Sequence, residues 1–218
     1  MVQLSDRPRT ARLRADASRN RERILAAAED AFVEFGADVP LDEIARRAGV
    51  GNATLYRHFA DRRALVHGVV VAVMAKAEAC ARAALAEEPD AFAALSRFVH
   101  ASVDWSIGAL CPMITKWTDL HDPELDRTRR QLTDAIGEIV TSAQAAGILR
   151  PDVTQDDILF GVSQLVRPPA GAEANPYAHR QLQLLLDGLR HQHTELPGEP
   201  ADFEELRGCC KVPAARLP

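Results

Sequence analysis

Two short helical segments, separated by a turn that contains glycine, constrain this chain more than any other feature. The sequence between residues 49 and 59 reads GVGNATLYRHF. The preceding segment, residues 40–49, opens with proline, has apolar residues at helical spacing and closes with Gly49. A second short helix is expected over residues 52–58, with Gly51 at its N-terminal cap. Two short helices joined by such a turn have the geometry of a helix-turn-helix.

The residues of the second short helix divide between two faces. Leu55 and Phe59 are four residues apart and are expected to hold this helix against the first one. The residues left to face outward are Asn52, Ala53, Arg57 and His58, with Tyr56 in part. In a major groove, arginine pairs with guanine and asparagine with adenine. Arg57 and Asn52 are therefore the best candidates for reading bases.

Other interpretations of this stretch are weaker. A phosphate-binding loop of the form GxxxxGK[ST] needs a preceding strand and a lysine, and the sequence offers neither. His58 as a catalytic base would need a nucleophile or an acid within reach, and the local sequence suggests none. A purely structural pair of helices remains the alternative to a DNA-reading one.

The charge distribution also indicates an anionic partner at the N-terminal end. The net charge is −5, but residues 1–67 carry 12 arginines against 10 acidic residues, and the rest of the chain carries the acidic excess. Within residues 1–23 there are seven arginines and three acidic residues. A basic end on an acidic body suits a nucleic acid, although a solvated basic arm has the same composition.

The periodicity predicts an all-α fold of about nine helices, because no segment shows strand alternation. Four regions are expected: a flexible basic arm over 1–17, a helix-turn-helix domain over 18–67, a ligand-binding and dimerisation domain over 68–195, and a flexible tail over 196–218. Prolines punctuate the longer helices expected at 90–107, 110–119, 123–147, 154–166 and 176–193.

Cysteine usage and hydropathy favour a cytoplasmic protein without a membrane partner. None of the four cysteines forms a C-x-x-C pair, and adjacent Cys209 and Cys210 suit a disulfide with each other poorly. No signal region and no run of about 18 apolar residues is apparent. The spacing of His100, Asp104, Cys111 and His121 matches no strong metal-ligand pattern, so neither a metal nor another cofactor is expected.

Longer stretches of the chain resemble a known family. The run PLDEIARRAGVGNATLYRHFADRRAL, residues 40–65, resembles the DNA-binding signature of TetR-family transcriptional regulators, and RILAAAEDAFVEFG resembles the first helix of that family. The segments AAGILRPDVTQDDILFGVSQLVRP and RQLQLLLDGLR resemble the SbtR-type C-terminal body of some members. The resemblance implies a repressor that is not an enzyme. It would bind a near-palindromic double-stranded DNA operator as a homodimer and release it when a small-molecule effector binds.

The resemblance also assigns positions. It places Tyr56 and His58 where phosphate contacts are common, and Arg62 where a phosphate-binding lysine is usual. Gly51 stands in place of a frequent serine. The predicted DNA-binding residues are Arg23, Arg46, Arg47, Gly51, Asn52, Ala53, Thr54, Tyr56, Arg57, His58 and Arg62.

The C-terminal body carries two apolar stripes and a group of large rings. The stripes are expected at the dimer interface, through Ile158, Leu159, Val162, Leu165, Val166, Leu182, Leu185, Leu186 and Leu189. The predicted ligand pocket comprises Phe98, Ser102, Trp105, Met113, Trp117, His121 and Phe160. Both sets are also compatible with an ordinary core. A helical enzyme or small-molecule carrier that retains a helix-turn-helix-like end is the alternative function.

Overall fold

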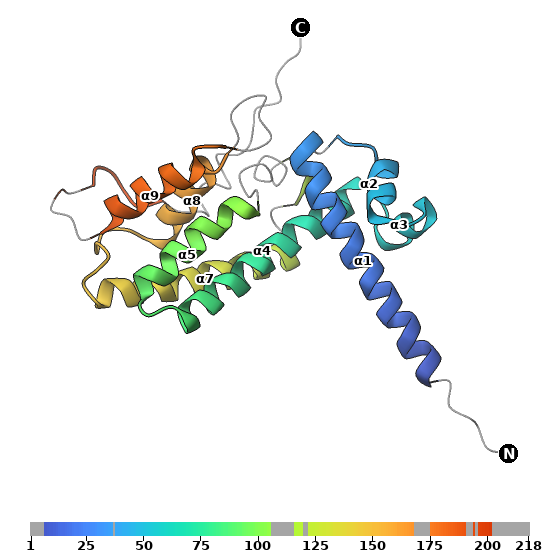
Figure 1. Cartoon of the computed structure of the whole chain (residues 1–218), viewed down its shortest axis with the longest axis horizontal. Helices are drawn as coiled ribbons and strands as arrows, with labels where there is room; N and C mark the ends of the chain where they lie inside the picture. Colours follow the sequence, from blue (N-terminus) through green and yellow to red (C-terminus); the bar gives the residue numbers. More distant parts are fainter. Residues whose placement is uncertain are drawn as a thin grey trace, which may run out of the picture. The chain divides into compact units, whose positions relative to one another are not determined.

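The structure is a computed structural model that describes residues 7–36, 38–105, 116–119, 122–167, 175–190, 194 and 196–201. It contains the helices α1 (Arg7–Phe35), α2 (Leu41–Ala48), α3 (Asn52–His58), α4 (Arg62–Glu87), α5 (Ala91–Asp104), α7 (Pro123–Ala145), α8 (Gln155–Leu165) and α9 (Ala178–Leu189) (Figure 1). The described residues form no β-strand, only an isolated bridge between Leu149 and Arg190. The predicted all-α class is confirmed. Most of the helix expected at 110–119 lies outside the described residues.

Backbone contacts divide the chain into two compact units, Met1–Val69 and Val70–Pro218. In the first unit, α1 contacts both α2 and α3, and α2 contacts α3 (Figure 1). The side chains buried between them share the helical spacing of their elements: Ile24, Ala28, Ala31 and Phe32 of α1, Ile44, Ala45 and Ala48 of α2, and Leu55 of α3. This small core fixes the two short helices against the longer one.

The first helix begins earlier than the sequence suggested. The arm over residues 1–17 was expected to be flexible because it has no apolar stripe, but α1 already begins at Arg7. Alanine, leucine and arginine are strong helix formers and make up most of residues 7–17, so intrinsic propensity favours a helix there. Pro8 falls in the first turn, where its missing N–H removes no helical hydrogen bond. The flexibility expected of residues 1–17 stays a prediction.

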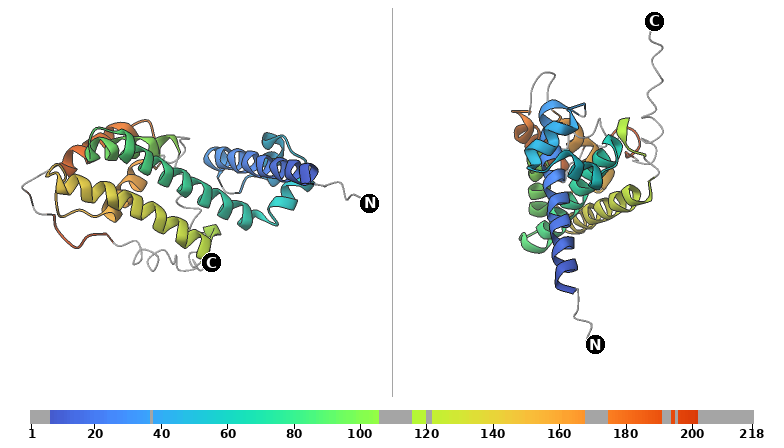
Figure 2. Two further views of the ribbon diagram at one scale, coloured as in Figure 1. Left: turned by 90° about the horizontal axis from the view of Figure 1, so that it is seen from below. Right: turned by 90° about the vertical axis from the view of Figure 1, so that its right-hand side faces the viewer.

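The second unit is a layered helical bundle. α5 contacts α7 and α9, and α8 contacts α7 and α9 (Figure 2). Ala77, Ala81 and Ala84 of α4 are fully buried in the same core, where their small side chains let α4 approach its neighbours closely.

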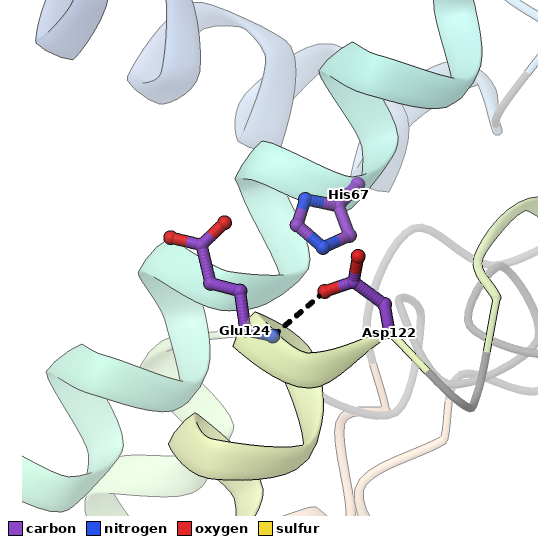
Figure 3. A group of neighbouring side chains, drawn as sticks. All are labelled: His67, Asp122 and Glu124. Atoms are coloured by element: carbon purple, nitrogen blue, oxygen red, sulfur yellow. Dashed lines mark hydrogen bonds between the residues drawn. The ribbon is translucent and has the colours of Figure 1, made fainter.

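Carboxylate and hydroxyl caps define where the helices of this unit begin. Asp122 Oδ1 accepts hydrogen bonds from the backbone N–H groups of Glu124 and Leu125, each at 3.0 Å (Figure 3). Thr154 and Asp157 form a reciprocal capping box at the start of α8. Such caps satisfy N–H groups that would otherwise lack partners, and each contributes about 1 kcal/mol to helix stability.

The apolar stripes of α8 and α9 contribute mainly to the core of the chain itself, and their role in a dimer stays a prediction. Six of the nine residues expected at the dimer interface are buried within the single chain: Ile158, Val162, Val166, Leu182, Leu186 and Leu189. Leu159, Leu165 and Leu185 are only partly buried. Helical periodicity showed that these faces are covered, but not which surface covers them.

The predicted pocket residues also separate. Phe98 and Trp105 are buried and meet edge to face, with ring centroids 6.2 Å apart. The buried Ser102 hydroxyl donates to the backbone oxygen of Val99 at 2.6 Å. Phe160, in contrast, is 40% exposed, and its place in a ligand pocket stays a prediction. Trp117 is half-buried, whereas Met113 and His121 lie outside the described residues.

A surface hollow of about 590 Å³ lies elsewhere on this unit. Leu85 of α4, Gly137 of α7 and Gln155 of α8 contribute to its lining, together with polar side chains of α7. None of the predicted pocket residues contributes to it.

One helix is more apolar than the sequence reading suggested. α4 has the length and composition of a membrane span, with an 18-residue window of mean hydropathy 1.6. Its buried residues explain this composition, because Leu65 and Val66 pack into the first unit while Ala77 and Ala81 pack into the second. A helix buried in a protein core can have the same length and mean hydropathy as a membrane span.

Candidate DNA-binding interface

The turn between α2 and α3 depends on one left-handed glycine. Gly49 has φ 63° and ψ 37°, and its N–H donates back to the carbonyl of Arg46 at 3.1 Å. The N–H of Val50 reaches the carbonyl of Ala45 at 3.0 Å, so two carbonyls at the helix end are satisfied. A Cβ at Gly49 would lie only 2.5 Å from Nη2 of Arg23. Both the backbone conformation and the approach of Arg23 therefore require glycine here.

α3 begins and is held as the sequence predicted. Gly51 is the N-cap, with extended backbone and no side-chain hydrogen bond to the helix. Leu55 and Phe59 are buried against the first unit. The guanidinium of Arg21 covers the ring of Phe59, with Cζ 5.3 Å from the ring centroid. These contacts fix which face of α3 points away from the core.

The outward face of α3 carries the residues expected to contact DNA. Asn52, Ala53 and Arg57 are exposed, and Tyr56 is 51% exposed. Thr54 is partly buried. The face therefore combines an amide, a guanidinium and a phenol around a small residue that permits close approach. Arginine and asparagine are the side chains that discriminate base edges best.

His58 is less accessible than the sequence suggested. Its Nε2 is buried and has no hydrogen-bond partner among the described residues. Burial lowers the pKa of His58, and the positive charges of Arg57 and Arg21 lower it further. The ring is therefore neutral near pH 7, and any phosphate contact would be a hydrogen bond from a neutral imidazole rather than an ion pair.

Asn52 is oriented by a residue that the sequence reading missed. Its amide nitrogen donates to Oδ1 of Asp42, in the first turn of α2, at 2.8 Å. An ionised carboxylate can only accept, so the NH₂ group must face Asp42 and the amide oxygen must point elsewhere. The two residues are ten positions apart in the sequence and gave no local signal, since only the folded turn brings them together.

Arg46 and Arg47 share one acidic partner. Glu43 accepts from Arg46 Nη2 at 2.7 Å and from Arg47 Nε at 2.9 Å, and Arg47 also pairs with Glu34 of α1 at 2.6 Å. Hydrogen bonds from Arg46 and Arg47 lower the pKa of Glu43 to about 2. The Arg47 guanidinium also lies 4.9 Å from the ring centroid of Phe35. Arg47 therefore braces α2 against α1, whereas Arg46 is well exposed.

The remaining predicted cations lie at the edges of this surface. Arg23 is exposed and donates to the carbonyl of Gly49 at 3.2 Å. Arg62 is partly buried at the first position of α4, next to Asp61. Asp61 caps that helix by accepting from the N–H of Ala64 at 2.8 Å. The contacts of all these residues with DNA stay predictions.

The described residues of either unit, taken alone, contain no group of three or more metal-ligating side chains.

Comparison with known proteins agrees with this geometry. A family model described as bacterial regulatory proteins of the tetR family matches residues 24–69, and one described as the C-terminal domain of SbtR-like transcriptional regulators matches residues 88–191. Together the two models cover both units.

Solved structures match over most of the chain. A TetR transcriptional regulator from Streptomyces coelicolor is 31% identical, with a TM-score of 0.61 over 79% of this chain and 99% of that one. A TetR transcription regulatory protein from Mycobacterium vanbaalenii is 34% identical, with a TM-score of 0.62 over 82% of this chain and 99% of that one.

Curated relatives match over a shorter stretch of the chain. An HTH-type transcriptional regulator of Staphylococcus aureus strain USA300 is 41% identical over 59 residues, which are 27% of this chain and 32% of the relative. The chain thus matches about a third of the length of these curated relatives. The family models and the solved structures indicate a regulator and not an enzyme. The chain belongs to the TetR family and is a DNA-binding transcriptional regulator.

Proposed function

We propose that this protein is a cytoplasmic repressor that binds a near-palindromic operator as a homodimer and leaves it when a small molecule binds the second unit. The observation that carries the proposal is the outward face of α3, where Asn52, Ala53, Tyr56 and Arg57 are exposed beside the turn at Gly49. In a dimer, two such helices would enter successive major grooves about 34–36 Å apart.

The division of labour within this surface follows from chemistry. Arg57 is expected to pair with guanine, because its guanidinium is exposed and can donate two parallel hydrogen bonds. Arg62, Arg23 and the exposed Arg46 are expected to contact phosphates, which adds affinity and salt dependence but no sequence preference. Arg47 is expected to contribute less, since two carboxylates already engage it.

A homodimer is supported by an apolar surface on α8 and α9. Leu184 is 63% exposed and Phe160 is 40% exposed, although both are large and apolar. Leu184 lies on one helical stripe with Leu185 and Gly188, and a Cβ at Gly161 of α8 would lie 3.5 Å from Leu185 Cδ2. α8 and α9 therefore present a joint face with small residues among the large ones. Covering it with the same face of a second copy would give a two-fold dimer, as a palindromic site requires.

Release by a small molecule would be a shift between two states. The proposed pocket involves Phe98, Ser102, Trp105 and Trp117 among the described residues, whereas Met113 and His121, also expected to line it, lie outside them. A ligand changes the operator affinity only by the ratio of its affinities for the bound and free arrangements. Release from the operator therefore needs a ligand that binds the free arrangement more tightly than the DNA-bound one, and it needs no covalent chemistry.

The test is an unbiased operator selection with the full chain, followed by a gel shift of the selected DNA. We expect a salt-sensitive, sequence-selective shift with a two-fold symmetric consensus, and a small-molecule screen that recovers compounds reversing it. Selected DNA without any consensus would contradict operator recognition. A consensus without two-fold symmetry would contradict the homodimer alone.

A further inference from the structure

Two histidines from distant parts of the chain meet on the second unit. Nδ1 of His100 on α5 lies 3.0 Å from Nδ1 of His179 on α9. Their rings are stacked, with centroids 5.3 Å apart and planes at 30°. His179 is exposed and His100 is partly buried, so solvent reaches the pair from one side.

A chain of hydrogen bonds fixes which nitrogen of His100 carries a proton. The Asp187 carboxylate can only accept, so Nε2 of Gln183 donates to it at 2.9 Å and the Gln183 oxygen faces the other way. That oxygen lies 3.4 Å from Nε2 of His100, which must then be the protonated nitrogen of the neutral ring. The lone pair of His100 is therefore on Nδ1 and points toward His179.

This is the arrangement of a metal ligand. A histidine that binds a metal through one nitrogen usually donates its other N–H to an oxygen, which sets the tautomer and the ring orientation. His100 has this support from Gln183, and Asp187 supports Gln183 in turn. In the metal-free pair, a single proton between the two Nδ1 atoms is shared in one hydrogen bond.

We propose that His100 and His179 bind a divalent transition metal ion through their Nδ1 atoms and so link α5 to α9. Zinc–nitrogen bonds are about 2.0–2.1 Å long, so two nitrogens on one ion lie about 2.9–3.4 Å apart for angles from about 90° to the tetrahedral value. The observed 3.0 Å falls in this range, and binding requires the shared proton to leave and both rings to turn until their lone pairs meet at the ion. Imidazole ligands suit Zn²⁺, Ni²⁺ and Cu²⁺ better than Mg²⁺ or Ca²⁺. Water on the exposed side would complete the coordination.

The site does not depend on the proposed repressor mechanism, and no spacing motif in the sequence indicates it. The two histidines are 79 residues apart and belong to no ligand-spacing motif. Among potential metal ligands, the sequence groups His100 only with Asp104, Cys111 and His121, which lie close to it along the chain. Packing of α5 against α9 supplies the real neighbour.

Calorimetric titration of the full chain with Zn²⁺ tests the proposal. We expect His179→Ala to lose one equivalent of bound Zn²⁺ relative to the wild type, and to lose the increase in melting temperature that this equivalent confers. Arg180→Ala removes an exposed neighbour on the same helix and should bind as the wild type does. Equal zinc stoichiometry in the wild type and His179→Ala would overturn the proposal, because the pair would then be only a hydrogen-bonded contact.

A second variant guards against a loss that arises from altered folding. His179→Cys keeps a ligand at the same place, so its complex with Co²⁺ should show the near-ultraviolet absorption of a thiolate–cobalt bond. In the double variant that combines His179→Cys with His100→Ala, titration of that band should give a Co²⁺ affinity at least tenfold weaker. A His179→Cys protein without the band, or one whose band does not depend on His100, would contradict the site.

Discussion

The amide nitrogen of Asn52 donates a hydrogen bond of 2.8 Å to Oδ1 of Asp42, which joins the start of the recognition helix to the start of the helix before it. One hydrogen of the Asn52 NH₂ group is therefore engaged by Asp42, while the second hydrogen and the amide oxygen stay available to a base. A bidentate contact with adenine needs that remaining N–H and the oxygen. Asp42 therefore holds the Asn52 amide in one orientation.

The first prediction concerns this contact. The wild type should prefer adenine at the base that Asn52 faces. Asp42→Ala removes the carboxylate that orients the amide and should weaken this preference. Asp42→Asn provides the control, because its side-chain oxygen still accepts the hydrogen bond while the charge is gone. Operator selection with the three proteins measures the effect, and identical base preferences in all three would show that Asp42 does not orient Asn52.

The second prediction tests the turn. Gly49→Ala places a side chain at φ 63°, 2.5 Å from the Arg23 guanidinium, and should destabilise the protein by about 1–2 kcal/mol. Gly51 has ordinary extended backbone and open space around its Cα, so Gly51→Ser should change stability by less than about 0.5 kcal/mol. Urea unfolding followed by circular dichroism compares the two. Equal effects would mean that the left-handed conformation at Gly49 costs nothing.

The third prediction concerns acid. The Arg46 and Arg47 guanidinium groups lower the pKa of Glu43 from 4.5 to about 2 in the folded protein. Because the folded pKa is the lower one, the stabilisation is present above pH 4.5 and is lost as the pH falls toward 2. The difference in urea midpoint between the wild type and Glu43→Gln should therefore shrink over this window. A difference that stays constant across it would show that Glu43 is not paired in solution.

The fourth prediction addresses the dimer. Leu184→Glu puts a charge at the centre of the exposed apolar face of α8 and α9 and should raise the dimer dissociation constant by about tenfold or more. Gln131→Glu adds the same charge at an exposed position on α7 and is expected to leave assembly unchanged. Sedimentation velocity over a concentration series distinguishes them. Wild-type protein that sediments as a monomer throughout would contradict this interface.

The sequence predicted the local features of the fold better than its tertiary contacts. Gly49 is predicted as a helix end from residue type alone, and Asp61, which caps α4, carries the same kind of local signal, because both act on their own neighbours. The pairing of Glu43 with Arg46 and Arg47 was also readable, since the residues are three and four apart on one helix. The prediction that Arg46 and Arg47 contact DNA does not take this pairing with Glu43 into account.

Contacts between elements were harder to predict. Leu182 and Leu184 look alike in the sequence, but one is fully buried in the core and the other is mostly exposed. The partners Asp42 and His179 became apparent only when α2 met α3 and α5 met α9. Periodicity identifies a covered face, whereas only packing identifies the residue that covers it.

We expect α3 to read bases while neighbouring arginines contact the phosphates of the DNA backbone. Fluorescence anisotropy measures base preference and salt dependence for the wild type, Arg57→Ala and Arg62→Ala. The DNA is a selected operator and its single-base variants, titrated at a series of salt concentrations. We expect Arg57→Ala to lose about 1–3 kcal/mol on the operator and to relax the preference at one base pair. Arg62→Ala should weaken binding to every DNA sequence alike. It should also reduce by about one the slope of the logarithm of the binding constant against the logarithm of the salt concentration. If both variants weaken all sequences uniformly and leave the base preference intact, α3 does not read the operator through Arg57.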